Sequence, residues 1–372
     1  MYTPKVGRRI ALSIALFTSL FISTMAIGGE SRLGIDRAHY GVWDRTSFYN
    51  IEDYPFTTGQ SFSQEWGRMH IARGVYDWTW LDESLQYAYE QGHKCYIKIQ
   101  PVNGDVSHPE WLGDPEHGVP TFSDGVNTYG DYLDPEFQEI FAEMVMAFGD
   151  YVRNGVPEHL QGVVAWVRVE SGRSGDEVPF TDHNNVPAEY QISDEEWKAY
   201  KLWVYGLYDQ AFQEGEGYVV PLLFNAVQPE KNPDMWAWCV ENVTGGLGSK
   251  YGGTVRGHHL TTSATVSRSF KHLAEDNDMG LFSRNEMDQT WQWGWFESIG
   301  NLKLSMYWTA VEQLHAGMSV WDVTGSCLTR TYEDEHEFAF EFFDRWAAES
   351  VSYTHLRAHE TGRNRVCRLL RE

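Results

Sequence analysis

The sequence predicts a single (β/α)8 barrel, the TIM-barrel architecture of the α/β class. Between residues 33 and 349, short runs rich in β-branched and aromatic residues alternate with amphipathic stretches, and eight such units can be counted. This alternation is typical of βα units around a parallel sheet. A chain of 372 residues with 42% hydrophobic residues is also long enough to bury one core of barrel size.

Eight largely apolar runs of strand length, separated by turn-forming residues, are the predicted barrel strands. In chain order they lie at residues 37–43, 65–70, 95–102, 163–170, 218–226, 253–260, 280–287 and 318–323.

The helices predicted between these strands carry recognisable end signals. Asp134 and Pro135 form an N-cap and a first helical turn, and Ser193 and Glu196 form a capping box for a helix that continues to residue 212. Gly92 ends an earlier helix whose apolar residues recur three and four positions apart. The last two helices are predicted at residues 296–315 and 335–348.

Residues 1–28 have the composition of a signal peptide. Three basic residues precede an apolar run at residues 10–27 that contains no acidic residue, and Ala26-Ile27-Gly28 has the small-x-small pattern of a cleavage site. An uncleaved membrane anchor is the alternative, because the run nearly reaches spanning length. In both cases we expect the remainder to be secreted or periplasmic.

The final segment, residues 351–372, differs from the rest of the chain in carrying five arginines against two glutamates. It resembles translated sequencing-adapter sequence of the kind found at broken ends of assembled metagenomic reads. We therefore expect the barrel domain to cover residues 29–350 and the natural protein to continue past Ser350.

Charge and cysteine usage narrow the possible partners. With 29 basic and 53 acidic residues the net charge is −24, which opposes nucleic acid binding and would require a local cationic pocket for any anionic substrate. The four cysteines have no metal-ligand spacing, and no HExxH motif occurs. We expect neither a metal nor another cofactor.

A basic residue two positions before a polar strand tip recurs on six of the predicted strands. Residues two apart in a strand share a face, so these pairs would converge at the mouth of the barrel, where active sites of this fold are built. The pairs are Arg37-x-His39, Arg68-x-His70, Lys98-x-Gln100, Arg168-x-Glu170, Arg256-x-His258 and Arg284-x-Glu286.

The fourth strand shows which side chains should face inward. Its odd-numbered residues, 163 to 169, are all apolar and suit the helix-facing side. Trp166, Arg168 and Glu170 therefore point into the barrel. We expect Trp166 to belong to the core and Glu170 to lie at the mouth.

Carboxylates at strand ends predict glycosidic bond hydrolysis, which uses one carboxyl group as acid and a second as nucleophile or base. Glu286 is the candidate on the seventh strand. The fourth strand offers Glu170 by strand geometry and Glu177 in the following loop. A separation of about 5 to 5.5 Å would predict retention of the anomeric configuration, and about 6.5 to 9.5 Å would predict inversion.

Substrate-binding candidates are the side chains near the same strand ends that can pair with, donate to or stack on a sugar. Tryptophan can stack on the apolar face of a sugar ring, and histidine, asparagine and arginine can donate to hydroxyls or sulfates. These candidates are Arg168, Asn225, His258, His259, Arg284, Trp291, Trp293 and Trp321.

The chain resembles the clan A glycoside hydrolases, especially the family 42 β-galactosidase-like barrels. The shared features are the GVYDW segment after the second strand, a tryptophan-containing fourth strand that ends in a carboxylate, Glu286 and Trp321. The resemblance implies a TIM-barrel glycosidase without a cofactor. Clan A members usually have Asn-Glu at the end of the fourth strand, whereas this chain has Val169-Glu170.

Two short motifs also resemble those of β-amylases. SGRSGDE at residues 171–177 is similar to a GxxGE motif, and NEMD at residues 285–288 is similar to LEM. That resemblance implies an inverting mechanism, with the acid at Asp176 or Glu177 and the base at Glu286.

The leading hypothesis is a secreted glycoside hydrolase acting on a β-galactoside or a related galactan, with or without sulfate groups. The interior basic residues motivate the anionic substrate. An inverting α-glucanase similar to β-amylase and a non-catalytic carbohydrate-binding barrel are the alternatives, and the fold alone does not separate them.

Overall fold

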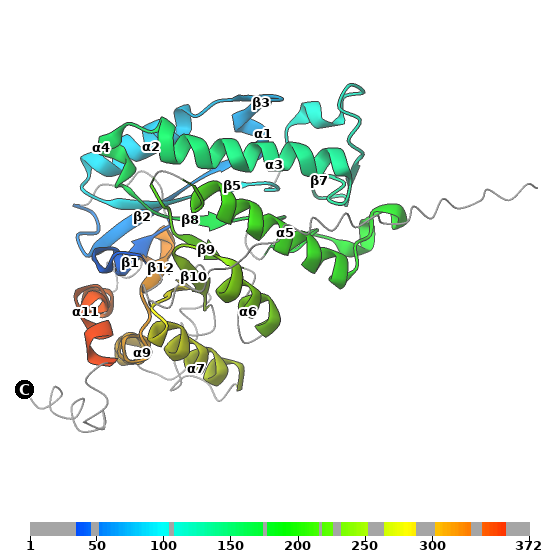
Figure 1. Ribbon diagram of the computed structural model, residues 1–372. Coiled ribbons are helices and arrows are strands. Elements are labelled where there is room, and N and C mark those ends of the chain that lie inside the picture. Colours follow the sequence, from blue (N-terminus) through cyan, green and yellow to red (C-terminus); the bar gives the residue numbers. More distant parts are fainter. Residues whose placement is uncertain are drawn as a thin grey trace, which may run out of the picture. The chain divides into compact units, whose positions relative to one another are not determined.

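The computed structural model contains a closed barrel of eight parallel strands, in the order β1-β12-β11-β10-β9-β8-β5-β2, which confirms the predicted fold (Figure 1). The residues that the structure describes are 35–45, 52–103, 108–173, 177–215, 218–225, 232–251, 264–287, 302–328 and 337–354. The barrel strands are β1 (Gly41–Asp44), β2 (Thr57–Glu65), β5 (Lys94–Gln100), β8 (Val164–Val169), β9 (Leu222–Phe224), β10 (Leu247–Lys250), β11 (Phe282–Met287) and β12 (Val320–Val323).

Helices follow the strands and pack around the barrel (Figure 1). The main ones are α2 (Thr79–Glu90), α3 (Pro135–Asp150), α5 (Asp194–Phe212), α6 (Pro233–Asn242), α7 (Ala264–Asp278), α9 (Leu302–Ala316) and α11 (Phe338–Thr354). Shorter elements are η1 (Arg37–His39), α1 (Trp66–Met69), η2 (Glu110–Gly113), η3 (Tyr151–Gly155), α4 (Glu158–Gln161), η4 (His183–Asn185) and η5 (Ala188–Tyr190). Two hairpins, β3 (His70–Ala72) with β4 (Val75–Tyr76) and β6 (Thr121–Ser123) with β7 (Thr128–Gly130), lie outside the barrel sheet.

No helix within the described ranges is long and apolar enough to cross a membrane. The predicted signal peptide and residues 355–372 of the predicted non-native segment lie outside those ranges.

Both predicted N-caps are confirmed. The Asp134 carboxylate accepts the backbone N–H groups of Glu136 and Phe137 at the start of α3. Ser193 and Glu196 form a reciprocal capping box at the start of α5, in which the side chain of each accepts the backbone N–H of the other. These bonds satisfy N–H groups that have no partner inside the helix.

We expect Ser193→Ala to lower the free energy of unfolding by about 1 kcal/mol, because an N-cap hydroxyl is lost while the core is untouched. Urea unfolding followed by circular dichroism measures this as a lower midpoint with an unchanged slope. An unchanged midpoint would show that the capping box contributes nothing to stability.

Three of the predicted strands are corrected by the structure. The first barrel strand begins at Gly41, after η1. The second is β2, which lies before the predicted segment, and most of that segment forms α1. The sixth is β10, and the predicted run at residues 253–260 lies outside the described ranges. β2 and β10 escaped prediction because they carry small and polar residues, such as Gly59 and Gly248, where large apolar ones were expected.

Those two glycines make room for large rings inside the barrel. A Cβ atom on Gly59 would overlap the Trp43 ring, and one on Gly248 would overlap the Phe282 ring. Trp166 packs between Trp43, at 4.2 Å between ring centroids, and Tyr96, at 5.2 Å, which confirms that Trp166 belongs to the core. These aromatic rings fill the interior, so the polar residues further along the strands lie towards the carboxyl ends.

Candidate active site

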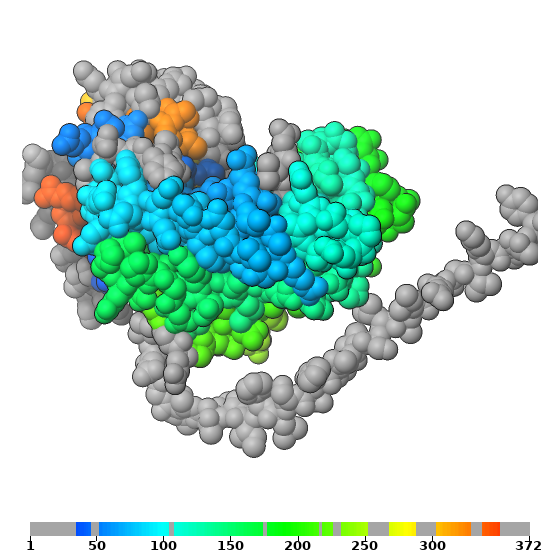
Figure 2. Space-filling view, turned by 90° about the horizontal axis from the view of Figure 1, so that it is seen from above, coloured from blue at the N-terminus to red at the C-terminus, as the bar shows by residue number. Residues whose placement is uncertain are grey.

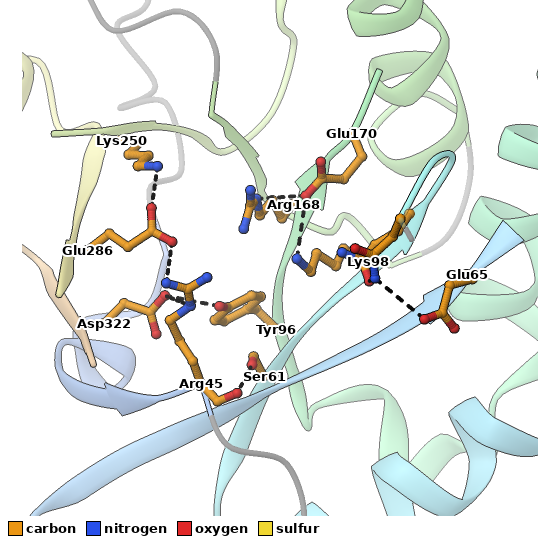
Figure 3. Close-up of polar contacts among 12 residues, drawn as sticks. Arg45, Ser61, Glu65, Tyr96, Lys98, Arg168, Glu170, Lys250, Glu286 and Asp322 are labelled. Atoms are coloured by element: carbon orange, nitrogen blue, oxygen red, sulfur yellow. Dashed lines mark hydrogen bonds and ion pairs between the residues drawn. The ribbon is translucent and has the colours of Figure 1, made fainter. Parts of the chain in front are cut away.

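Glu286 lies on β11, near the carboxyl end of the strand, and its side chain is surrounded by cations. It forms ion pairs with Arg45 and Lys250 (Figure 3), and its Oε1 is 3.4 Å from a guanidinium nitrogen of Arg284. Burial alone would raise the pKa of the Glu286 carboxyl, but its cationic neighbours outweigh burial and hold that pKa well below its usual range. Glu286 is therefore an ionised carboxylate.

Glu170 directly follows β8 and is fully buried. Its Oε1 lies 2.9 Å from Arg168 Nε and 3.7 Å from Lys98 Nζ. Burial and the Arg168 charge lower the pKa of Lys98 to about 7. Arg168 and Lys98 each also interact electrostatically with Glu286, so Glu170 and Glu286 face one shared cationic space inside the barrel (Figure 3).

Glu177 lies behind the tip of β8 rather than inside the barrel. Its Oε2 accepts the Tyr205 hydroxyl of α5 at 3.0 Å and lies 3.4 Å from Ser171 Oγ, and the indole of Trp197 donates to its backbone carbonyl. Burial, followed by the negative charge of Glu170, raises the pKa of Glu177 to about 7. Its φ of 51° is the one positive value reported for a non-glycine residue in the described ranges, which marks local strain.

Asp322 was not predicted, although it is central to the charge network. It lies beside Glu286 in the parallel register of β11 and β12 and is fully buried. Its Oδ2 accepts from Arg284 Nε at 2.7 Å and from the Tyr96 hydroxyl at 3.0 Å. The alternation rule used for the fourth strand would have found it, because Val320 and Asp322 share the inner face.

Arg45 and Lys250 were also missed. Arg45 directly follows β1, and Lys250 ends β10, a strand that the sequence did not reveal. Both pair with Glu286. The sequence signal available for both was a basic residue at or directly after the end of a short strand. Many basic residues on protein surfaces have the same position.

Three of the six predicted pairs of a basic residue and a polar strand-tip residue are not part of the barrel interior that the structure describes. Arg37 and His39 lie in η1, before the first strand, and Arg68 is an exposed residue of α1 whose side chain pairs with Glu65. Arg256-x-His258 lies outside the described ranges. The remaining pairs, on β5, β8 and β11, have Lys98, Arg168 and Arg284 in the shared interior.

The predicted substrate-binding residues divide into three groups. Arg168 and Arg284 lie in the interior, fully buried, and Asn225 is buried directly after β9. Trp321 is a correction: its ring packs on Phe340 and Phe343 of α11, at 4.7 and 5.4 Å between centroids, so it faces the helix layer and offers no stacking surface. The others lie outside the described ranges, namely His258, His259, Trp291 and Trp293.

Within the part of the chain that the structure describes, no three His, Cys, Asp or Glu side chains are placed to hold a metal ion. The interior chemistry of the described residues is therefore that of carboxylates, guanidinium groups and ammonium groups.

Comparisons with known proteins give a likeness of fold. Neither a protein-family model nor a curated protein sequence matches the chain. A solved structure titled as the catalytic domain of a β-amylase from Paenibacillus polymyxa is 8% identical, with a TM-score of 0.47 over 76% of this chain and 91% of that one. A xylanase from Cellvibrio japonicus is 10% identical, with a TM-score of 0.43 over 77% of this chain and 86% of that one. A β-galactosidase from Marinomonas ef1 is 13% identical, with a TM-score of 0.42 over 76% of this chain and 53% of that one.

Proposed function

We propose that this protein is a glycoside hydrolase in which Glu170 and Glu286 act on the two sides of a glycosidic bond. The observation that carries the proposal is that these carboxylates, from β8 and β11, face one buried space and share the electrostatic influence of Arg168 and Lys98. Hydrolysis by this route needs two carboxyl groups in different protonation states.

Glu286 takes the role of the ionised carboxylate. Its three cationic neighbours keep it deprotonated across the working pH range, as a nucleophile or a base for water requires. The same neighbours hold its orientation, so the carboxylate is already placed before substrate arrives.

Glu170 and Glu177 together supply the acid. Burial and the negative charge of Glu170 raise the pKa of the Glu177 carboxyl to about 7, so Glu177 holds the proton of the pair up to about that pH. In the reaction this proton passes to the Glu170 carboxylate, which delivers it to the leaving oxygen, because Tyr205 holds the Glu177 carboxyl on the α5 side while Glu170 shares its cationic space with Glu286.

We expect kcat/KM to fall as pH rises through about 7, because Glu177 then loses its proton. Glu177→Gln should lower kcat/KM and remove this alkaline limb, since the amide has no proton to lose. Tyr205→Phe should move the limb to higher pH, because the lost hydroxyl bond favours ionised Glu177. The pH profiles of the three proteins measure both effects.

The two substitutions are matched, since each changes only one end of the Tyr205–Glu177 hydrogen bond. Glu170, Lys201 and Arg168, the charged groups that act on Glu177, stay in place. An alkaline limb that stays at the wild-type pH in both variants would remove Glu177 as the source of the proton.

The substrate that we propose is a β-galactoside or a related galactan, with sulfate groups on some sugars. The basic side chains around both carboxylates support an anionic substrate, because arginine and lysine bind sulfate oxygens. Outside the cytoplasm is the proposed location, supported by the leader-like residues 1–28.

A panel of neutral galactan, sulfated galactan and starch tests this function. Release of reducing ends from a galactan, with the anomer formed first recorded by NMR, is the expected result and also decides between retention and inversion. Hydrolysis of starch alone, with inversion, would favour the β-amylase-like alternative. Binding without turnover of any substrate would favour a carbohydrate-binding barrel.

A further inference from the structure

A cavity lies on the loops that follow β2 and β5, away from Glu170 and Glu286. Its volume is about 700 Å³, within the range of small-molecule sites. Figure 2 shows the segment after β2, in blue, beside the loop after β5, in cyan and teal. The residues that matter here are His70, His108, Glu110, Trp111, Asp114 and Thr121, all of which line the cavity.

The Trp111 ring is held in place before any ligand binds. Its indole N–H donates to the backbone carbonyl of His70 at 2.8 Å, and its ring meets the rings of His70 and His117 edge-on, each at 4.7 Å between centroids. The side chain is half-buried, so part of its surface lies open. A tryptophan fixed in this way is a preorganised stacking platform for the apolar face of a sugar ring.

The two histidines of the cavity have opposite tautomers. The indole of Trp66 donates to Nδ1 of His70 at 2.9 Å, so the neutral His70 ring carries its proton on Nε2. Nδ1 of His108 lies 3.0 Å from the Pro109 carbonyl, which only accepts, so that ring carries its proton on Nδ1. One Nε2 atom is a donor and the other an acceptor; both atoms are buried, and neither has a partner among the described residues.

The charge of this cavity is opposite to that of the barrel interior. Among the described residues, the charged ones that line it are Glu110 and Asp114, and no lysine or arginine does. Carboxylates accept hydrogen bonds from sugar hydroxyls but repel sulfate. The cavity therefore suits an uncharged sugar.

The cavity also lies close to the rim of the proposed active site. Glu65 ends β2, two residues before the lining residue Gly67, and Asn103 connects it to Gln100 at the end of β5, with bonds of 3.5 and 3.3 Å. β5 is the barrel neighbour of β8, which leads to Glu170. The cavity and Glu170 therefore lie at the carboxyl ends of adjoining strands.

We propose that this cavity is a distal subsite, in which Trp111 stacks on a neutral sugar of the polysaccharide whose linkage lies between Glu170 and Glu286. The inference rests on the proposed function for the identity of the chain it binds. In this assignment the enzyme binds an uncharged sugar on the β2–β5 side, while cations surround the linkage that is cleaved.

Calorimetric binding of neutral β-1,4-galactohexaose to the full-length protein carrying Glu286→Gln, which the proposed function makes too slow to hydrolyse it, tests the subsite. In that protein Trp111→Ala should raise the Kd about tenfold through loss of stacking. Trp238→Ala, which changes a half-buried tryptophan of α6 that does not line the cavity, should leave the Kd unchanged. Equal affinity with and without Trp111→Ala, with both proteins folded, would overturn the proposal.

Asp114→Lys gives a test that does not depend on the fold tolerating a lost tryptophan, because Asp114 is exposed. The added cation should make the protein bind sulfated galactohexaose more tightly relative to the neutral form. An unchanged ratio of the two Kd values would overturn the neutral-sugar assignment. Hydrolysis of galactan by the wild-type protein is measured separately. It distinguishes failure of the hydrolase proposal from failure of the subsite proposal, since loss of binding at Trp111 does not depend on turnover.

Discussion

Glu286→Gln is expected to lower kcat on galactan by about 10³- to 10⁴-fold, because the amide is neither a nucleophile nor a base. The change keeps the shape of the side chain and removes only its charge. Reducing-end release at fixed pH measures the effect. The large size of the expected loss follows from the position of Glu286 as the ionised member of the pair, with Arg45 and Lys250 bound to it.

Glu65→Gln is the matched control. Glu65 is a carboxylate at the end of β2, on the same rim of the barrel, but it is partly exposed and bonded to Asn103 and Arg68. Its activity should stay within a few-fold of the wild type. Full activity of Glu286→Gln, in a protein shown by its unfolding curve to be folded, would remove Glu286 from the mechanism and the hydrolase proposal with it.

The second large effect concerns stability. Asp322→Leu is expected to lower the free energy of unfolding by about 3 to 5 kcal/mol, because the buried Arg284 guanidinium loses its principal anionic partner. Arg284 is fully buried and Asp322 accepts from its Nε at 2.7 Å, so the charge that remains cannot reach water without opening the barrel. Urea unfolding measures the change as a lower midpoint.

The double variant Arg284→Met with Asp322→Leu separates charge from packing. Replacing both members of a buried ion pair with apolar residues is often close to neutral, so most of the lost stability should return. If the double variant is as unstable as Asp322→Leu alone, the loss came from packing, or from the Tyr96 hydroxyl that also donates to Asp322, and not from an uncompensated charge.

The strands show where prediction from sequence succeeded and where it failed. β8 was found because apolar residues alternate with Arg168 and Glu170, and in β11 the pair Arg284-x-Glu286 repeats that spacing. The spacing also indicated that Arg168 and Arg284 face inward. β2 was missed because its inner face carries Gly59, Ser61 and Ser63, so no apolar period was visible. A strand whose interior side chains are small looks like a loop until its neighbours supply the rings that fill the space.

The site divides in the same way. On the sequence, strand geometry favoured Glu170 and motif similarity left Glu177 open. The fold separates them by bonding Glu177 to Tyr205 of α5 and leaving Glu170 next to Arg168. Trp321 was expected at the mouth of the barrel, but its ring faces the helices. Its neighbour Asp322 points into the barrel instead, because adjacent residues in a strand point to opposite sides.

Local patterns by themselves determined the class of fold, the helix caps and the inward orientation of the charged residues on β8 and β11, since each of these depends on residues a few positions apart. Only the tertiary structure decided which charges meet. Glu286 lies beside Asp322, Arg45 and Lys250 because strand register and barrel closure bring together residues that are remote in the chain. No local spacing in the sequence encodes the distances between them.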